Sequence, residues 1–314
     1  MQRSGAKMKI NIVVGKVMHG WEPTDKRLGG TEDAAVEWRR RLIERGHEVK
    51  VYRNGRGGPQ PEGYYERDTY YPDSDITINI NSSDIPAAGP TIYITNETNA
   101  NTLDLSSYDA VVWPTQYAEE TIPVNNAQRF ILPYGYDHTK IFPMEKVINQ
   151  CLYASSPDRG LDALERIWPR VVEQFPDATL VVTYGGKIDG PNITCGEFTN
   201  DEMDELYCKS DLWLHPCNGG ELFCITGIKA QAAEAIPVYF PTMALGETVK
   251  EGYPCMDETD MFRKICELMN SGYKKGKVRQ ALRKHHYDSW DDSTDALEQI
   301  LLSVLEYRQN EHRD

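Results

Sequence analysis

The sequence predicts an α/β protein with two parallel-sheet domains in tandem, and three observations support this fold class. The chain has 314 residues, which suits two domains of about 150 residues each. Short apolar runs typical of strands alternate with amphipathic helical patterns along most of the chain. Glycine, proline and polar residues separate these runs, as in the connections of α/β units.

The first β-loop-α-β unit lies near the N-terminus. Residues 9–14 (KINIVV) form an apolar strand, and a helical pattern runs from Thr31, its expected N-cap, to Arg45. Gly46 ends this helix, and residues 49–52 form the next strand. Such a unit requires a parallel sheet with a right-handed crossover. Further strands of this half are expected at 76–80, 91–95, 110–113 and 130–133.

A second α/β series begins at Gln150, after a stretch at 137–147 that resembles an interdomain linker. Strands are expected at 151–154, 179–183, 211–215 and 237–240, and helices at 160–175, 200–209, 227–235, 258–271, 275–286 and 293–308. We therefore expect an N-terminal Rossmann-like domain at 1–137, on which 290–314 packs back, and a C-terminal one at 138–289. Two such halves are expected to face a cleft at the carboxyl ends of their sheets.

Composition excludes several classes of function. The formal net charge of -14 argues against a duplex nucleic-acid groove, which needs clustered lysine and arginine. The seven cysteines contain no CxxC pair, so no zinc site and no other metal site is expected. No segment approaches the ~20 apolar residues of a membrane span, and residues 10–14 are too short for a signal-peptide core. We expect a cytoplasmic protein with reduced thiols.

Three glycine-containing or basic turns are candidate anion sites. Gly29 and Gly30 precede a helix, whose free N–H groups and dipole favour an anion, although a flexible loop has the same composition. The turn Ser155–Gly160 follows a strand, and its Arg159 offers a bidentate fork to phosphate oxygens, although a surface arginine in a turn is the simpler alternative.

The third turn is Gly219-Gly220-Glu221, after the strand that ends at His215. We expect this loop to open a helix, with N–H donors and a carboxylate in front of them. The plainer alternative is that Glu221 is only a favourable charge at a helix start.

The order of these features resembles a retaining glycosyltransferase of the GT-B fold, in the large family 4 (glycosyl transferases group 1). The resemblance covers most of the chain. It rests on segments 28–32, 45–49, 132–137 with Phe142, 153–161 (YASSPDRGL), 177–180, 184–185, 205–216, 221–226 and 287–291.

The resemblance implies the site. Glu221 and Arg159 would be catalytic, with Glu221 near the donor sugar's hydroxyls and Arg159 on its phosphates. The implied donor-binding residues are Gly29, Gly30, Ser155, Ser156, Glu197, Phe198, Gly219, Gly220, Leu222, Phe223, Cys224 and Lys229. Asn96 and Glu97 would lie on the acceptor side. No cofactor is implied beyond the co-substrate, a UDP-, GDP- or ADP-linked sugar, and the acceptor would be a glycan or a small molecule.

The sequence departs from the family pattern at the second glutamate of its Glu-x7-Glu signature. In the family this carboxylate holds the donor's ribose, but the chain has Lys229, which donates hydrogen bonds and cannot accept them. Glu234 stands where the family usually has glycine, and Ser155 or Ser156 replaces the first basic residue of its phosphate pair.

The expected activity is therefore transfer of a hexosyl-type sugar from a nucleotide diphosphate to an acceptor hydroxyl, with retention and without metal. The alternative is a diverged, catalytically silent protein of the same fold that binds a nucleotide sugar or a glycan, and Lys229 favours it. A GT-B epimerase or phosphorylase is a weaker alternative.

Overall fold

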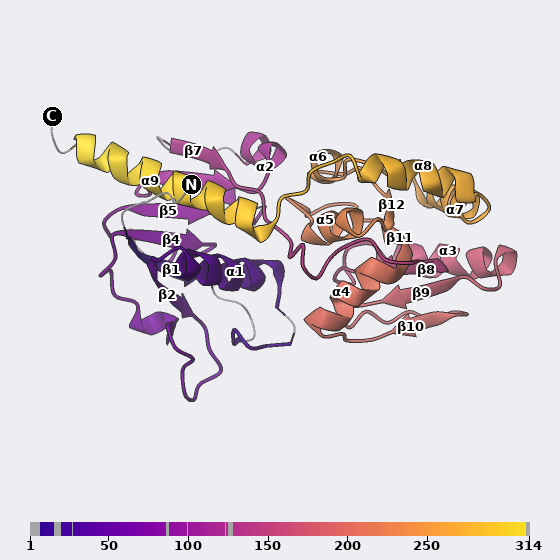
Figure 1. Cartoon of the computed structure of the whole chain (residues 1–314), viewed down its shortest axis with the longest axis horizontal. Coiled ribbons are helices and arrows are strands. Elements are labelled where there is room, and N and C mark those ends of the chain that lie inside the picture. The colour runs from indigo at the N-terminus through magenta and orange to yellow at the C-terminus, as the bar shows by residue number, and fades with distance from the viewer. Residues whose placement is uncertain are drawn as a thin grey trace. The chain divides into compact units, whose positions relative to one another are not determined.

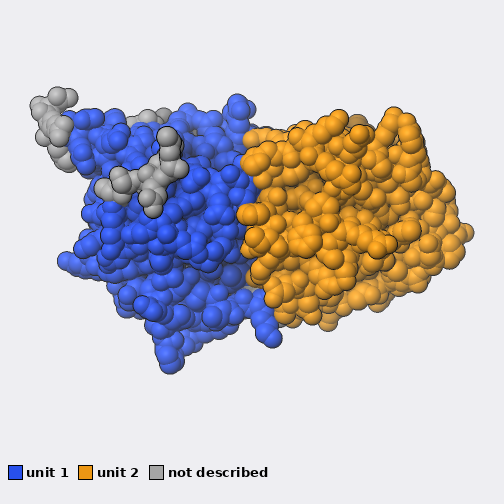
Figure 2. Space-filling model, in the orientation of Figure 1, with its two compact units in different colours: residues 1–135, 288–314 blue, residues 136–287 orange. Residues whose placement is uncertain are grey.

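The computed structural model describes residues 7–15, 20–26, 28–85, 88–98, 100–122, 124 and 128–311. The chain divides into two compact units, coloured separately in Figure 2. Unit 1 comprises residues 1–135 and 288–314, and unit 2 comprises residues 136–287. The last segment of the chain therefore belongs to the same unit as the first.

Unit 1 contains a seven-stranded sheet in the order β3-β2-β1-β4-β5-β6-β7 (Figure 1). Every neighbouring pair in it is parallel. The strands are β1 (Lys9–Val14), β2 (Glu48–Arg53), β3 (Tyr64–Glu66), β4 (Ile76–Ile80), β5 (Thr91–Ile94), β6 (Ala110–Trp113) and β7 (Gln128–Ile131). The central strands β4, β5 and β6 are buried along their whole length, as expected for a parallel sheet covered on both faces.

The helices of unit 1 are α1 (Gly30–Glu44), α2 (Gln116–Thr121) and α9 (Trp290–Glu311), with short 3₁₀ turns at Arg67–Thr69 and Ala100–Thr102. Helix α9, yellow in Figure 1, packs on α1. The indole of Trp38 donates to Ser293 Oγ at 3.1 Å, and this hydroxyl donates to the Pro133 carbonyl at 2.7 Å. These bonds tie α9 to the first domain.

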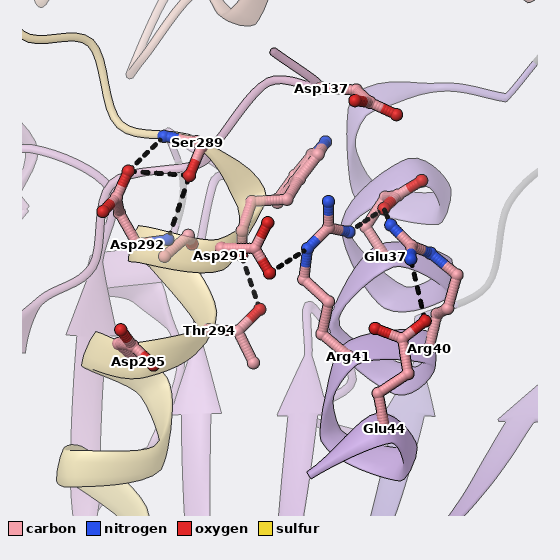
Figure 3. Close-up of polar contacts among 12 residues, drawn as sticks. Glu37, Arg40, Arg41, Glu44, Asp137, Ser289, Asp291, Asp292, Thr294 and Asp295 are labelled. Carbon is pink, nitrogen blue, oxygen red and sulfur yellow. Dashed lines mark hydrogen bonds and ion pairs between the residues drawn. The ribbon is translucent and has the colours of Figure 1, made fainter. Parts of the chain in front are cut away.

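Ionic contacts reinforce the docking of α9 on α1 (Figure 3). Arg41, which is buried, contacts Asp291 at 3.1 Å and also pairs with Glu37 one turn earlier on α1. Asp292 accepts hydrogen bonds from the backbone N–H and the hydroxyl of Ser289 at the start of α9. The capped first turn of α9 and its contact with the buried Arg41 stabilise this helix on unit 1.

Unit 2 contains a six-stranded parallel sheet in the order β10-β9-β8-β11-β12-β13. Its strands are β8 (Val147–Tyr153), β9 (Thr179–Val182), β10 (Ile193–Cys195), β11 (Ser210–His215), β12 (Ile236–Tyr239) and β13 (Tyr253–Pro254). Its helices are α3 (Leu161–Gln174), α4 (Asn200–Lys209), α5 (Ile225–Ala232), α6 (Leu245–Thr248), α7 (Glu258–Met269) and α8 (Gly272–Leu282). Two apolar cores, one on each face of the sheet, hold this unit together.

These elements confirm the expected fold class: two α/β domains with parallel sheets and a final helix that returns to the first. Two local expectations were wrong. The N-cap of α1 is Gly29, not Thr31, which lies inside the first turn. The stretch 137–147 is not a free linker, because Ile141 is buried in a core of unit 2 and Lys146 Nζ donates to the Cys208 carbonyl at 2.6 Å.

Within the described residues, no helix is both long and apolar enough to cross a membrane.

Candidate functional site

The predicted site residues of unit 2 follow strands of one sheet. Ser155 comes after β8, Glu197 after β10, and the loop 216–224 after β11. Because all these strands are parallel, their carboxyl ends lie along the same edge of the sheet. Ligands of open α/β sheets bind at this edge.

Arg159 connects the turn after β8 with the loop after β11. Its Nη1 donates to the Gly219 carbonyl at 2.9 Å and lies 3.6 Å from Glu221 Oε1. Its Nε lies 3.7 Å from the exposed carboxylate of Asp158. The structure therefore brings the two residues expected to be catalytic, Arg159 and Glu221, next to each other.

Two glycines make this close approach possible. Gly160 has φ +86°, and a Cβ there would collide with the Pro216 carbonyl. Gly220 has φ +83°, and a Cβ there would collide with the Arg159 guanidinium. Positive φ and the absence of a side chain are both required at these positions.

The expected role of Gly219-Gly220 as the start of a helix was wrong. Helix α5 begins at Ile225, after Cys224, which has φ +69° as its N-cap. The Gly220 N–H donates to Met243 Sδ at 2.8 Å, so it is already bonded within the protein. Leu222 and Phe223, between the glycines and the helix, are buried. The loop presents Glu221 instead of a row of helical N–H groups.

Glu221 lies between a guanidinium and an imidazole. Its Oε1 is 3.5 Å from His215 Nε2, and the His215 ring is stacked on Trp213 with 4.8 Å between centroids. Burial acts to lower the pKa of His215, but Cys224, Cys217 and Glu221 around it raise that pKa well above its usual value. Burial likewise acts to raise the pKa of the Cys217 thiol, and its hydrogen bond with His215 reverses the direction and lowers it.

Lys229 lies on α5, and its Nζ is 3.7 Å from Asp204 Oδ1 on α4. Asp204 is almost fully buried, and this burial raises the pKa of its carboxyl group although Lys229 opposes the shift. Sequence reasoning missed Asp204. The only sign of it in the sequence is a carboxylate on the face of helix α4 that packs against α5.

The remaining predicted donor-binding residues of unit 2 are Ser155, Ser156, Glu197 and Phe198. Ser155 is half-buried, Ser156 is exposed, and the Ser156 carbonyl accepts a hydrogen bond from the Tyr153 hydroxyl at 2.6 Å. Phe198 packs against a core of unit 2, and the exposed Glu197 lies beside Gly185 in the loop after β9. All of them lie at the same sheet edge as Arg159.

In unit 1, Gly29 and Gly30 stand at the N-terminus of α1 as expected. The carboxylate of Glu32 folds back over this end and accepts hydrogen bonds from the backbone N–H groups of Gly29 and Glu32. Burial raises the pKa of Glu32 despite these bonds. An internal carboxylate thus occupies donors that were expected to face an external anion.

The acceptor-side candidates follow β5. Asn96 Nδ2 donates to Thr31 Oγ1 at 2.8 Å, and the Asn96 backbone N–H donates to Asn81 Oδ1 at 3.1 Å. Glu97 is exposed. Asn96 therefore links β5 to the first turn of α1, whereas Glu97 leaves its carboxylate accessible.

Solved structures with this fold include several glycosyltransferases. Sucrose-phosphate synthase from Thermosynechococcus elongatus superposes with a TM-score of 0.71 at 12% identity, over 98% of this chain and 100% of that one. HepE from Anabaena, solved in complex with UDP and glucose, has a TM-score of 0.71 at 12% identity, over 94% of this chain and 100% of that one. AviGT4, a glycosyltransferase involved in avilamycin A biosynthesis, gives 0.64 at 14% identity over 95% and 98%.

These similarities extend over both units and confirm the GT-B fold. No protein-family model matches the chain. No curated protein sequence matches it either.

Proposed function

We propose that this protein is a glycosyltransferase that moves a hexosyl-type sugar from a nucleotide diphosphate to an acceptor hydroxyl. The observation that carries the proposal is the pairing of Arg159 with Glu221, whose nearest atoms are 3.6 Å apart, on the carboxyl edge of a GT-B fold. The fold is shared with glycosyltransferases, one of which was solved with UDP and glucose. Retention of configuration and metal-independent catalysis in the cytoplasm complete the proposal and rest on the resemblance of the motifs.

Arg159 would stabilise the leaving group. Negative charge grows on the diphosphate as the glycosidic bond breaks, and a fixed guanidinium stabilises that charge more in the transition state than before it. Arginine has five N–H donors, and one on Nη1 is donated to the Gly219 carbonyl. That bond fixes the orientation of the side chain, so little freedom is lost when phosphate oxygens bind.

Glu221 would hold the donor sugar. A carboxylate that accepts hydrogen bonds from sugar hydroxyls positions the ring and offsets the positive charge of an oxocarbenium-like transition state. Arg159 and His215, 3.6 and 3.5 Å from Oε1, fix the carboxylate in place. The other oxygen, Oε2, would accept hydrogen bonds from the sugar.

Asp204 would take over the ribose contact that Lys229 cannot make. A lysine is a donor only, whereas the Asp204 carboxylate beside it can accept from two hydroxyls. The partner molecules are then a UDP-, GDP- or ADP-linked sugar and a glycan or small-molecule acceptor. The alternative is a silent nucleotide-sugar-binding protein, which Lys229 favours.

A nucleotide-release assay separates these two functions. The protein is mixed with UDP-, GDP- and ADP-linked hexoses and a panel of glycan acceptors, and free nucleotide is followed over time. We expect release with one nucleotide class and an increase when the right acceptor is added. Binding of a nucleotide sugar without release, across all acceptors, would instead support the silent binding protein.

Replacing Arg159 with alanine is expected to raise the KM for the donor by at least about tenfold. The reason is the loss of a charge-assisted hydrogen bond, worth about 1.5–3 kcal/mol, to a phosphate. Initial rates at varied donor concentration measure this change. Arg263→Ala is the matched control, because its side chain is 66% exposed and pairs with Asp260 on α7, outside the loop that holds Glu221. Unchanged KM and turnover in the Arg159 variant would remove this residue from the site.

A further inference from the structure

The end of β11 and the loop after it gather side chains of the types that bind metal ions. His215 ends the strand, Cys217 and Glu221 lie in the loop, and Cys224 caps α5. Ligand atoms of His215, Glu221 and Cys224 all lie within 4.8 Å of one another. The Cys217 thiol in the same loop donates to the Gly219 carbonyl at 2.9 Å and is not one of these three ligands.

We propose that His215, Glu221 and Cys224 form a binding site for one soft divalent cation, zinc being the best match. Imidazole and thiolate ligands favour zinc over the hard cations magnesium and calcium, which prefer oxygen. One imidazole, one thiolate and one carboxylate supply three of the four ligands of a tetrahedral zinc site, and a water molecule can take the fourth position.

The distances between ligand atoms fit a tetrahedron. Zinc bonds of about 2.1 Å to nitrogen or oxygen and about 2.3 Å to sulfur put N and S about 3.6 Å apart, and N and O about 3.4 Å apart, at tetrahedral angles. The observed separations are 3.8 Å from His215 Nε2 to Cys224 Sγ and 3.5 Å from His215 Nε2 to Glu221 Oε1. The ligands need to move only slightly to enclose an ion.

Burial and charge also favour an ion at this place. His215 is fully buried, Cys224 is 7% exposed, and the Glu221 side chain is 15% exposed. One thiolate and one carboxylate carry two negative charges, which a divalent cation would balance. Stacking on Trp213 holds the imidazole in the required plane.

A bound ion would also regulate the activity proposed above, and this part of the inference rests on that function. The ion would take Glu221 as a ligand and so withdraw its carboxylate from the donor sugar. Zinc and the nucleotide sugar would then compete, and removal of the metal by a chelator would raise turnover.

Cobalt(II) binding to the intact protein tests the site without any sugar. We expect one Co²⁺ per chain, with intense visible d–d bands of a tetrahedral site and a near-ultraviolet sulfur-to-cobalt charge-transfer band. Zinc should displace the cobalt, and competition with a chromophoric chelator gives its affinity. Cys224→Ser is expected to weaken zinc binding by more than the 10–100-fold typical of outer-shell changes and to reduce the charge-transfer band.

Two further variants keep this test decisive. Glu221→Gln, at the most exposed of the three ligands, should also weaken zinc binding even if loss of a buried cysteine impairs folding. Cys195→Ser removes an exposed thiol outside the cluster and should leave the spectrum unchanged. Absence of the thiolate band in the wild-type protein, or equal zinc affinity in the wild type, Cys224→Ser and Glu221→Gln, would overturn the proposal. Metal binding without any nucleotide release would leave this site standing and refute the transferase function.

Discussion

Replacing Glu221 with alanine is expected to lower turnover at least about 100-fold, the scale of losing one transition-state contact. The carboxylate lies between Arg159 and His215 and leaves one oxygen for the sugar. Because the contact strengthens as the sugar becomes oxocarbenium-like, the loss should appear mainly in kcat. Steady-state nucleotide release measures it.

Glu165→Gln on α3 is the control, since this glutamate is exposed on the same unit and lies outside the loop. Its turnover should equal that of the wild type. Near-normal turnover in the Glu221 variant would show that this carboxylate does not contact the reacting sugar.

Replacing Asp211 with alanine is expected to destabilise the protein by about 3–5 kcal/mol, the usual cost of leaving a buried charge without its partner. Asp211 accepts from Lys275 Nζ at 2.7 Å and also pairs with Arg279, both on α8. The Asp211 and Lys275 side chains are only 2% and 10% exposed. The variant leaves the Lys275 ammonium buried and unpaired, and chemical denaturation measures the change in free energy of unfolding.

Asp201→Ala is the matched control, because its carboxylate is 84% exposed and pairs with the half-exposed Lys140. Exposed pairs contribute only about 0–1 kcal/mol. A loss below about 1 kcal/mol in the Asp211 variant, equal to that of the control, would contradict the assigned role of the buried pair.

The same aspartate gives a pH dependence of stability. Burial acts to raise the pKa of Asp211, but Lys275, the Asn149 N–H and Arg279 outweigh it and hold the pKa below its usual value. A carboxyl group with a lowered folded-state pKa stabilises the protein above its unfolded pKa of about 3.9. That stabilisation is lost as the pH falls through the folded-state pKa. The difference in free energy of unfolding between the wild type and Asp211→Asn should therefore become smaller in acid.

The elements with strong patterns could be predicted from the sequence. Strands such as Ile76–Ile80 and Ala110–Trp113, and the helix Asn200–Lys209, match the expected residues because apolar runs and a helical pattern mark them. Strands β3, β10 and β13 were missed, since they are short edge strands with three, three and two residues. Their pairing depends on the neighbouring strand, and a local pattern of that length carries little signal.

The sequence predicted which residues belong to the candidate site better than it predicted how they are arranged. Motif resemblance identified Arg159 and Glu221, and the structure brings them together. The sequence could not show that Gly220 bonds Met243, or that Asp204 lies beside Lys229. It also gave no sign of the proposed zinc site, because His215, Glu221 and Cys224 lack paired-cysteine spacing. Such contacts depend on how a loop folds between strands, which has no periodic signature.

The central claim is that the carboxyl edge of unit 2 binds a nucleotide sugar, and ligand-dependent thermal unfolding tests it most directly. UDP, GDP, ADP and their hexose conjugates are each added to the wild type and to Arg159→Ala. A ligand that binds only the folded state stabilises it by about 2.7 kcal/mol at 100 times its Kd. We expect one nucleotide class and its sugar conjugate to raise the Tm of the wild type, with a smaller shift in the variant. No shift in the wild type with any of these ligands would contradict the account.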